Sequence, residues 1–303
     1  MSTPFSHFSI KINQITPLET NFTEVLESIA LKPKTLYFYG KIPENIVENG
    51  KTVRPKTVAI VGSRHNTRYG EEVAYKLAYE LAKNDVIVIS GLAYGIDSIA
   101  HQAALDAGGK TIAVLGTPIN EIYPRSHESL AREIIKKDGA IISEYAPKEK
   151  YYPKSTFLKR NRLISGLSDA VVVVEAADRS GTLNTAAHAL SQGKDVYAVP
   201  GNITSPYSVG CNNLIKQGAI PYTTPEDLLS QLFPEKTFKT RAKLTGDTKE
   251  ETDILKALAD GLKNGEIIME RLSLSPTLFN ETITLLEIKG LVRSLGANNW
   301  SLL

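Results

Sequence analysis

Two loops of the sequence carry residue types that can hold an anion. Gly62-Ser63-Arg64 follows a short apolar run and leads, through Arg68, into a segment of helical period. Ser180-Gly181-Thr182 has the same place after a later apolar run. A loop that opens a helix presents free backbone N–H groups and the positive end of the helix dipole, which suit a phosphate. We expect an anion site at both loops; the alternatives are a tight turn with solvated arginines and a plain helix cap at Ser180.

The stretch of residues 145–162 combines positive charge with aromatic rings. It holds six basic residues against one acidic residue, Glu149. The basic residues are Lys148, Lys150, Lys154, Lys159, Arg160 and Arg162, and the rings are Tyr145, Tyr151, Tyr152 and Phe157. Bases of a single strand stack on such rings while cations follow the phosphates. The stretch therefore predicts binding of single-stranded nucleic acid, with a solvated charged face as the alternative; it predicts no basic helix for the major groove of a duplex.

Few residues are placed for catalysis or for a metal. Asp97 and His101 stand four apart, which would allow a shared metal, but structural hydrogen bonds are the preferred interpretation. Cys211 begins a helical segment without a neighbouring base and is interpreted as a core residue. No G-x-G-x-x-G fingerprint follows the first apolar run, and Gly109-Lys110-Thr111 leads into an apolar run rather than out of one, unlike a P-loop. We expect no cofactor, no metal and no catalytic residue.

Six apolar runs alternate with segments of helical period and must position these loops. The runs span residues 58–61, 86–89, 111–115, 140–142, 170–174 and 196–199. Continuous apolar runs of this length are typical of strands buried on both faces. The alternation predicts an α/β fold, an extended Rossmann-like doubly wound parallel sheet. Ligands bind at the carboxyl ends of the strands in such sheets, where both loops then lie.

The chain divides into four predicted regions. Residues 1–52 form a lead-in segment, with a helix expected at 23–30 and a strand at 35–39. Residues 53–233 form the Rossmann-like DNA-binding domain, and the polar, basic residues 234–248 a linker. Residues 249–303 predict three helices and a hairpin, the order typical of a small C-terminal winged-helix domain. Because its third helix carries Glu281 and Glu287 and no basic residue before Lys289, a protein contact or a regulatory role is expected at least as much as duplex reading by a transcription regulator.

The composition is that of an ordinary globular protein. The 303 residues are 42% hydrophobic and 22% charged, with a formal net charge of +2. The single cysteine excludes an intramolecular disulfide framework and fits a reducing compartment. We find no secretory signal and no apolar run long enough for a membrane span, so a cytoplasmic protein is expected.

Eight motifs, in order and spacing, resemble the DprA (Smf) family of bacterial DNA-processing proteins over about residues 31–229. They are Gly62-Ser63-Arg64 with Tyr69-Gly70, residues 90–97 with Ala100-His101, Tyr123-Pro124, Ser143-Glu144, Phe157 with Arg160-Asn161-Arg162, Ser180-Gly181-Thr182, Val199-Pro200-Gly201 and Gly210-Cys211-Asn212.

The resemblance implies a recombination mediator rather than an enzyme. Such a protein binds incoming single-stranded DNA in natural transformation, protects it from nucleases and, as a homodimer, loads RecA recombinase onto it. The resemblance assigns DNA contacts to Arg64, Lys154, Phe157, Arg160, Arg162 and Arg125. Together with the loops and the basic stretch, the expected DNA-binding residues are Gly62, Ser63, Arg64, Arg68, Arg125, Lys154, Phe157, Lys159, Arg160, Asn161, Arg162, Ser180, Gly181 and Thr182.

The main alternative is a nucleotide-binding or nucleotide-processing enzyme on the related fold. A nucleoside-monophosphate phosphoribohydrolase would carry a Pro-Gly-Gly-x-Gly-Thr loop followed closely by a catalytic glutamate. The corresponding loop, residues 180–185, has no glutamate after it. This counts against hydrolysis and leaves binding of a small nucleotide without turnover open.

Overall fold

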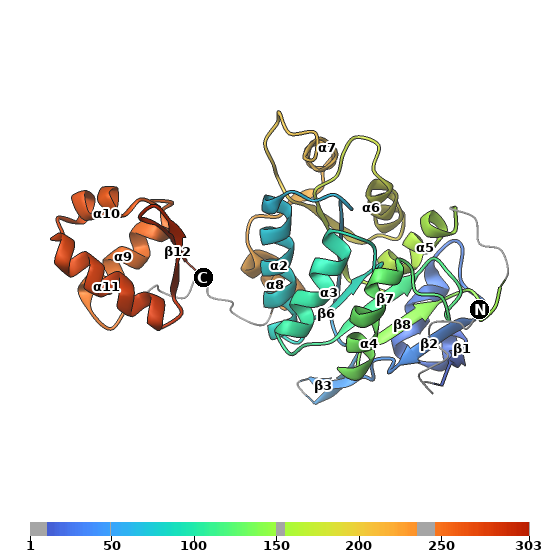
Figure 1. Cartoon of the computed structure of the whole chain (residues 1–303). Helices are drawn as coiled ribbons and strands as arrows, with labels where there is room; N and C mark the ends of the chain where they lie inside the picture. Colours follow the sequence, from blue (N-terminus) through green and yellow to red (C-terminus); the bar gives the residue numbers. More distant parts are fainter. Residues whose placement is uncertain (1–10, 49, 150–154, 235–245, 303) are drawn as a thin grey trace. The chain divides into compact units, whose positions relative to one another are not determined.

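The structure is a computed structural model that describes residues 11–48, 50–149, 155–234 and 246–302. The chain forms two compact units, Met1–Lys236 and Thr237–Leu303 (Figure 1). The first unit contains the sheet and the second a small helical bundle with a hairpin.

Within the described residues, nine strands of the first unit form one sheet, in the order β1-β2-β8-β7-β6-β5-β9-β10-β11. The strands are β1 (Asn13–Ile15), β2 (Leu36–Gly40), β5 (Thr57–Gly62), β6 (Ile87–Ser90), β7 (Thr111–Leu115), β8 (Ala140–Ser143), β9 (Ala170–Val174), β10 (Asp195–Ala198) and β11 (Ile220–Pro221). All neighbours from β8 to β11 pair in parallel, while β2 pairs antiparallel with β8 and with β1. The predicted doubly wound α/β sheet is confirmed, and its strand order reverses between β5 and β9.

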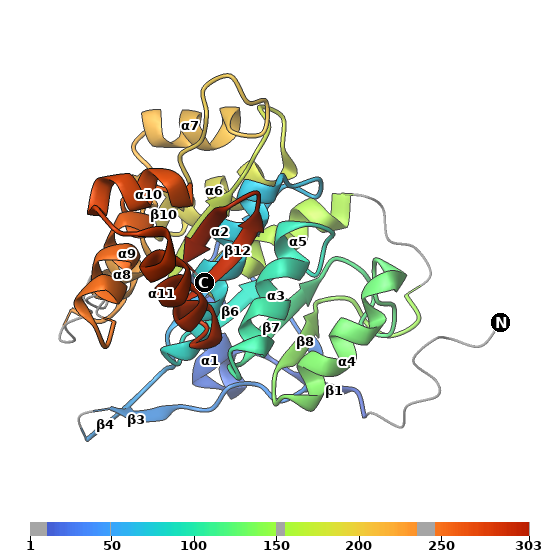
Figure 2. The ribbon, with the colours of Figure 1, turned by 60° about the vertical axis from the view of Figure 1, so that its left-hand side comes forward.

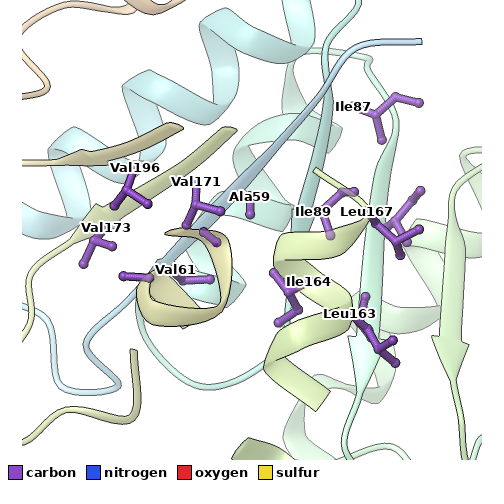
Figure 3. Close-up of a cluster of buried hydrophobic side chains, with 14 of the residues drawn as sticks. Ala59, Val61, Ile87, Ile89, Leu163, Ile164, Leu167, Val171, Val173 and Val196 are labelled. Atoms are coloured by element: carbon purple, nitrogen blue, oxygen red, sulfur yellow. The ribbon is translucent and has the colours of Figure 1, made fainter. Parts of the chain in front are cut away.

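Helices cover both faces of the sheet, which explains the continuous apolar runs. On one face α5 (Ser155–Gly166), α6 (Gly181–Ser191) and α7 (Val209–Lys216) pack on the strands. Figure 3 shows Leu163, Ile164 and the following Leu167 beside strand residues such as Ala59 and Val171. Alternate residues of the strands point the other way, toward α2 (Arg68–Lys83), α3 (Ile96–Asp106) and α4 (Glu128–Lys136).

Local sequence signals explain where α2 begins and ends. The side chain of Thr67 accepts a hydrogen bond from the Gly70 N–H and so caps the first turn. Leu77 and Leu81 lie on the buried stripe of the helix. The chain leaves the helix at Asn84, and the next residue, Asp85, has a φ of 61°. A further helix, α8 (Pro225–Leu232), packs against α2.

The lead-in residues are part of the first unit. The helix expected at 23–30 is instead the short helix α1 (Asn21–Glu24) followed by a 3-10 helix, Val25–Ser28. Phe22 and Leu26 lie in the same apolar cluster as the strands, and the strand expected at 35–39 is β2. The sequence did not predict β1 or the ribbon of β3 (Ile46–Glu48) and β4 (Lys51–Val53), which projects from the unit (Figure 2). These strands have three residues each, too few to show a period.

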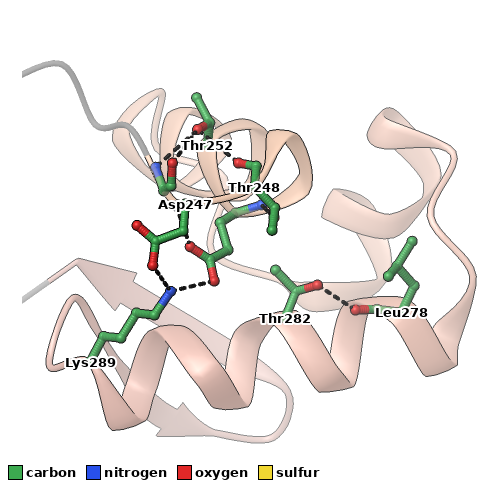
Figure 4. Close-up of polar contacts among 8 residues, drawn as sticks. Asp247, Thr248, Thr252, Leu278, Thr282 and Lys289 are labelled. Carbon is green, nitrogen blue, oxygen red and sulfur yellow. Dashed lines mark hydrogen bonds and ion pairs between the residues drawn. The ribbon is translucent and has the colours of Figure 1, made fainter.

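The second unit contains the predicted three helices and hairpin. They are α9 (Lys249–Ala259), α10 (Gly265–Leu272), α11 (Pro276–Ile288), β12 (Val292–Gly296) and β13 (Asn299–Leu302). The predicted cap of α11 is present, since the Ser275 side chain accepts from the Leu278 N–H. Lys289 forms ion pairs with Asp247 at 2.8 Å and with Glu251 at 2.6 Å (Figure 4). The winged-helix assignment stays a prediction.

None of the helices in the described part of the chain is both long enough and apolar enough to cross a membrane.

Candidate nucleic-acid interface

A pocket of about 560 Å³ lies where the strand order of the sheet reverses. Its walls come from the loops that follow β5 and β9 and from α5. Nine of the expected DNA-binding residues line it: Gly62, Ser63, Arg64, Phe157, Arg160, Asn161, Ser180, Gly181 and Thr182. The structure thus brings together three segments that are far apart in the sequence.

Direct hydrogen bonds join the segments that line the pocket and fix their positions relative to one another. The Thr182 hydroxyl donates to the Gly62 carbonyl oxygen at 2.9 Å, which ties the β9 loop to the β5 loop. The Asn161 amide donates to the Gly181 carbonyl at 3.3 Å and to Asn184 Oδ1 at 3.2 Å, which ties α5 to α6. Asn161 is therefore a positioning residue as well as part of the lining.

Two glycines allow the loops to approach this closely. A Cβ on Gly62 would lie 1.9 Å from the Val174 carbonyl oxygen. Gly95 has a φ of +75°, and a Cβ there would lie 2.3 Å from the Ser63 carbonyl oxygen. That same oxygen accepts a hydrogen bond from the Ile96 N–H at 3.1 Å, at the start of α3. A side chain at either glycine would push the Arg64 loop outward.

Arg160 forms part of the pocket wall, but its guanidinium is bound to the protein itself. The residue is 4% exposed, and Nη1 donates to the Gly91 carbonyl at 2.8 Å and to the Val114 carbonyl. Burial lowers the pKa of Arg160 to about 10, while the nearby Asp97 opposes that shift. Since this pKa remains well above 7, Arg160 supplies a fixed positive charge beneath the pocket surface.

Arg162 does not line the pocket. It is also 4% exposed, and its two terminal nitrogens bind both oxygens of Glu144, at 2.7 and 3.0 Å. This bidentate pair neutralises the charge of Arg162. The arrangement favours a role in holding α5 against the end of β8 over a direct DNA contact.

Four further expected residues lie outside the pocket lining or outside the described residues. Arg68 and Arg125 are exposed; Arg68 pairs with Glu72 at 3.1 Å. The ammonium of Lys159 lies 5.9 Å from the centre of the Tyr145 ring. Lys154 lies outside the described residues. Among the residues that the structure does describe, no acidic side chain pairs with Arg64 or Arg125, so both cations remain available to an external anion.

At the starts of α2 and α6, side chains of the protein itself accept hydrogen bonds from N–H groups that the sequence pattern assigns to an external anion. At α2 the Glu175 carboxylate accepts hydrogen bonds from the Thr67 N–H, at 2.8 Å, and from its hydroxyl. The protein's own anion therefore occupies the helix end that the sequence predicted for a phosphate, and an external anion at this loop is left to Arg64. At α6 the Ser180 side chain accepts from the Thr182 N–H at 3.2 Å, so the helix cap considered as the alternative is present.

The basic stretch contains a helix that the sequence did not predict. α5 begins at Ser155 and carries Lys159, Arg160 and Arg162. Because both arginines are buried, the helix offers no basic face of the kind that enters a major groove.

The structure adds pocket residues that sequence reasoning missed. They are Val61, His65, Ala93, Asp97, Leu158, Ile164, Ala177, Thr185 and Tyr207. Tyr207 reaches the pocket because its carbonyl accepts from the Ala176 N–H at 2.8 Å, just after β9. His65 was adjacent to the first loop in sequence and could have been included on that ground, whereas the apolar members carry no signal of their own.

Asp97 and His101 both form structural hydrogen bonds, as the preferred interpretation of the sequence expected. Asp97 Oδ2 accepts from the N–H groups of Gly91, at 3.0 Å, and Ala93, at 3.3 Å. His101 Nδ1 lies 2.7 Å from the Thr111 hydroxyl, and burial lowers the pKa of His101 to about 3. No group of three metal-binding side chains occurs in the described ranges. Burial raises the pKa of Cys211 to about 11, which leaves its thiol protonated and unreactive at neutral pH.

Comparisons with known proteins relate the chain to a family and to solved structures. The model of the family described as DNA recombination-mediator protein A matches residues 13–233. Protein Smf of Escherichia coli (strain K12) is 49% identical over 175 residues, which are 58% of this chain and 46% of that protein. The chain thus spans about half the length of this relative.

Two solved structures share the fold. DNA processing protein A from Streptococcus pneumoniae has a TM-score of 0.64 and 37% identity, covering 73% of this chain and 75% of that one. DNA processing protein A from Helicobacter pylori, solved to study its single-stranded DNA binding mode, has a TM-score of 0.64 and 29% identity. That match covers 75% of this chain and 98% of the Helicobacter pylori chain.

Proposed function

Because the chain belongs to the DNA recombination-mediator protein A family, which confirms the resemblance carried by its motifs, we propose that it binds single-stranded DNA in the pocket at the strand reversal. The observation that carries the proposal is the meeting of Arg64, Phe157 and the Ser180 loop around one pocket. A cation, a ring and small donors around one space match the phosphate and base of one nucleotide.

The chemistry of each wall gives it a role. Arg64, exposed and unpaired among the described residues, contacts phosphate. Phe157 offers its ring to a base, and Arg160 adds fixed positive charge from beneath. We extend the binding surface to Arg68, Arg125, Lys154 and Lys159, which would follow the phosphates of the strand outside the pocket. Arg162 acts through its pair with Glu144 and so positions α5.

The proposed role is that of a mediator and not of an enzyme. In the pocket lining the acidic side chain is Asp97, and its carboxylate already accepts two backbone N–H groups. A general base or nucleophile needs a carboxylate that can reach the substrate. This supports the proposal that residues 53–233 hold DNA without cleaving it, while residues 249–303 form a winged-helix domain that contacts protein.

We propose further that the protein acts in the cytoplasm as a homodimer. There it would protect incoming single strands from nucleases and load RecA recombinase onto them during natural transformation. We propose these steps from membership of the family alone. The chain spans about half the length of its relative from Escherichia coli.

The first test is fluorescence-anisotropy titration of a labelled single strand, with the matching duplex in parallel at two salt concentrations and no added nucleotide. We expect tight, salt-sensitive binding of the single strand and weaker binding of the duplex. Equal or absent binding of the two DNAs would overturn the proposal. Titration of nucleoside monophosphates at the same pocket would then test the alternative of a small-nucleotide site.

A further inference from the structure

A second aromatic surface lies beside the pocket and is not used by the function proposed above. The ring of Tyr123 packs on the ring of Phe157, with 5.3 Å between their centres and an interplanar angle of 53°. Tyr123 is nevertheless 50% exposed. Because Phe157 lines the pocket, Tyr123 continues the aromatic surface of the pocket outward.

Tyr94 is a second exposed ring at the same rim. It follows Ala93, which lines the pocket, and it is 49% exposed. The His127 ring packs against Tyr94 edge to face, with 5.0 Å between centres and an angle of 70°. The Ser126 hydroxyl donates to the Tyr94 oxygen at 3.1 Å. These contacts hold the ring in one orientation while half of its surface stays open.

The short segment from Tyr123 to His127 connects the two rings and carries a cation, Arg125. Arg125 begins the 3-10 helix Arg125–His127 and is exposed. His127 anchors the segment, since its Nδ1 lies 2.9 Å from the Leu92 carbonyl oxygen. In the described part of the chain no carboxylate pairs with Arg125. Two held rings, with an unpaired cation on the segment that connects them, have the composition of a stacking surface for single-stranded nucleic acid.

We propose that Tyr94 and Tyr123 form a second, stacking subsite, which takes the nucleotides next to the one in the pocket. Bases stack on the two tyrosine rings, beside Arg125, whose phosphate contact is already part of the proposed function. The subsite rests on the proposed function, because its position matters only if the strand enters the pocket. Rings that are already oriented lose little freedom on stacking, so the subsite raises affinity for longer strands.

The test compares two DNA lengths on the full chain. A trinucleotide with one thymine between two abasic sites offers its base to the pocket and no base to the rim, while an oligothymidylate of about 12 nucleotides offers bases to both. We expect Tyr94→Ala to weaken binding of the longer strand by about 5- to 100-fold, the loss of one stacked base. The same variant should bind the trinucleotide as the unchanged protein does. Tyr94→Phe keeps the ring and should bind both strands normally.

Tyr75→Ala is the matched control, because Tyr75 is an exposed tyrosine of α2 outside the pocket lining. Tyr123→Ala should also affect the longer strand, and its trinucleotide affinity reports any disturbance of Phe157. A longer strand with abasic sites outside the pocket should bind the unchanged protein and Tyr94→Ala alike.

The outcomes separate the two proposals. If the unchanged protein binds neither DNA, the proposed function is wrong, and the subsite with it. If it binds both and Tyr94→Ala and Tyr123→Ala bind the longer strand equally well, the subsite is wrong and the proposed function stands. Equal weakening of both DNAs by Tyr94→Ala would also overturn the subsite, since the ring would then act through the shape of the pocket.

Discussion

The guanidinium of Arg160 occupies the space that a side chain at Gly91 would need. A Cβ on residue 91 would lie 2.6 Å from both Nη1 and Nη2 of Arg160. Nη1 also donates to the carbonyl oxygen of Gly91 itself, at 2.8 Å. The glycine that follows β6 and the arginine of α5 are therefore structurally coupled, and a change at either one disturbs the other.

The Gly91→Ala substitution tests this coupling. The added methyl must displace a buried, hydrogen-bonded guanidinium, so we expect a loss of about 1–3 kcal/mol in the free energy of unfolding. Chemical denaturation measures it. In an Arg160→Met background the same methyl should cost much less, because the two sites share one contact. Equal costs in the two backgrounds would show that the pair is not coupled.

Arg64→Ala tests the phosphate contact that we propose for the pocket. Loss of one contact should weaken single-strand binding and reduce the slope of log K against log salt by about 0.7. Anisotropy titrations at several salt concentrations measure both quantities. Lys76→Ala, which removes an exposed lysine of α2 outside the pocket lining, is the control and should change neither. An unchanged slope for Arg64→Ala would contradict the assignment.

Arg162→Ala should act on stability rather than on the salt dependence of DNA binding. The substitution leaves the Glu144 carboxylate, whose side chain is 9% exposed, without its partner. Breaking such a pair costs about 3–5 kcal/mol. The double variant Arg162→Met with Glu144→Gln should recover much of this loss in urea denaturation. A reduced salt slope in a folded Arg162 variant would instead indicate a direct phosphate contact.

His101 predicts a specific dependence of stability on pH. Burial lowers its pKa from 6.5 to about 3, so the folded protein holds it neutral while the unfolded chain takes up a proton below pH 6.5. The contribution of the neutral His101 side chain to the free energy of unfolding is complete above pH 6.5. It is lost as the pH falls toward 3, by up to about 1.4 kcal/mol per pH unit. The stability difference between the unchanged protein and His101→Gln should therefore shrink over this window. A difference independent of pH would show that His101 titrates normally in the fold.

The sequence predicts most of the sheet because its signals there are local. The strands from β5 to β10 contain continuous apolar runs, with polar residues at strand ends such as Thr57 and Asp195, which marks strands covered on both faces. The loops of the site follow from that sheet, since parallel strands end at one edge. The Gly62 and Ser180 loops could therefore be predicted to meet from the sequence, whereas Phe157, on the unpredicted α5, was assigned from the basic stretch and the family resemblance.

The sequence does not predict which cations stay free. Arg64 and Arg162 look alike in a charge count, yet Arg162 is paired with Glu144, 18 residues away. Arg160 is bound by Gly91, 69 residues away, and by Val114, 46 residues away. Burial and pairing depend on such distant partners, which no local pattern contains. For the same reason the aromatic rim of Tyr94 and Tyr123 has no signature in the spacing of its residues.

The carboxylate of Glu175 at the start of α2 has a consequence for how a strand can move. A helix end that cradles one phosphate with backbone groups would lock the polymer at that nucleotide. Here Glu175 already accepts the Thr67 N–H and hydroxyl, and an anion on that side is left to Arg64, which is exposed. A flexible side chain can follow a phosphate over some distance and exchange it for the next one. If the pocket binds a strand as proposed, we expect the strand to move past Arg64 rather than to stay fixed at one nucleotide.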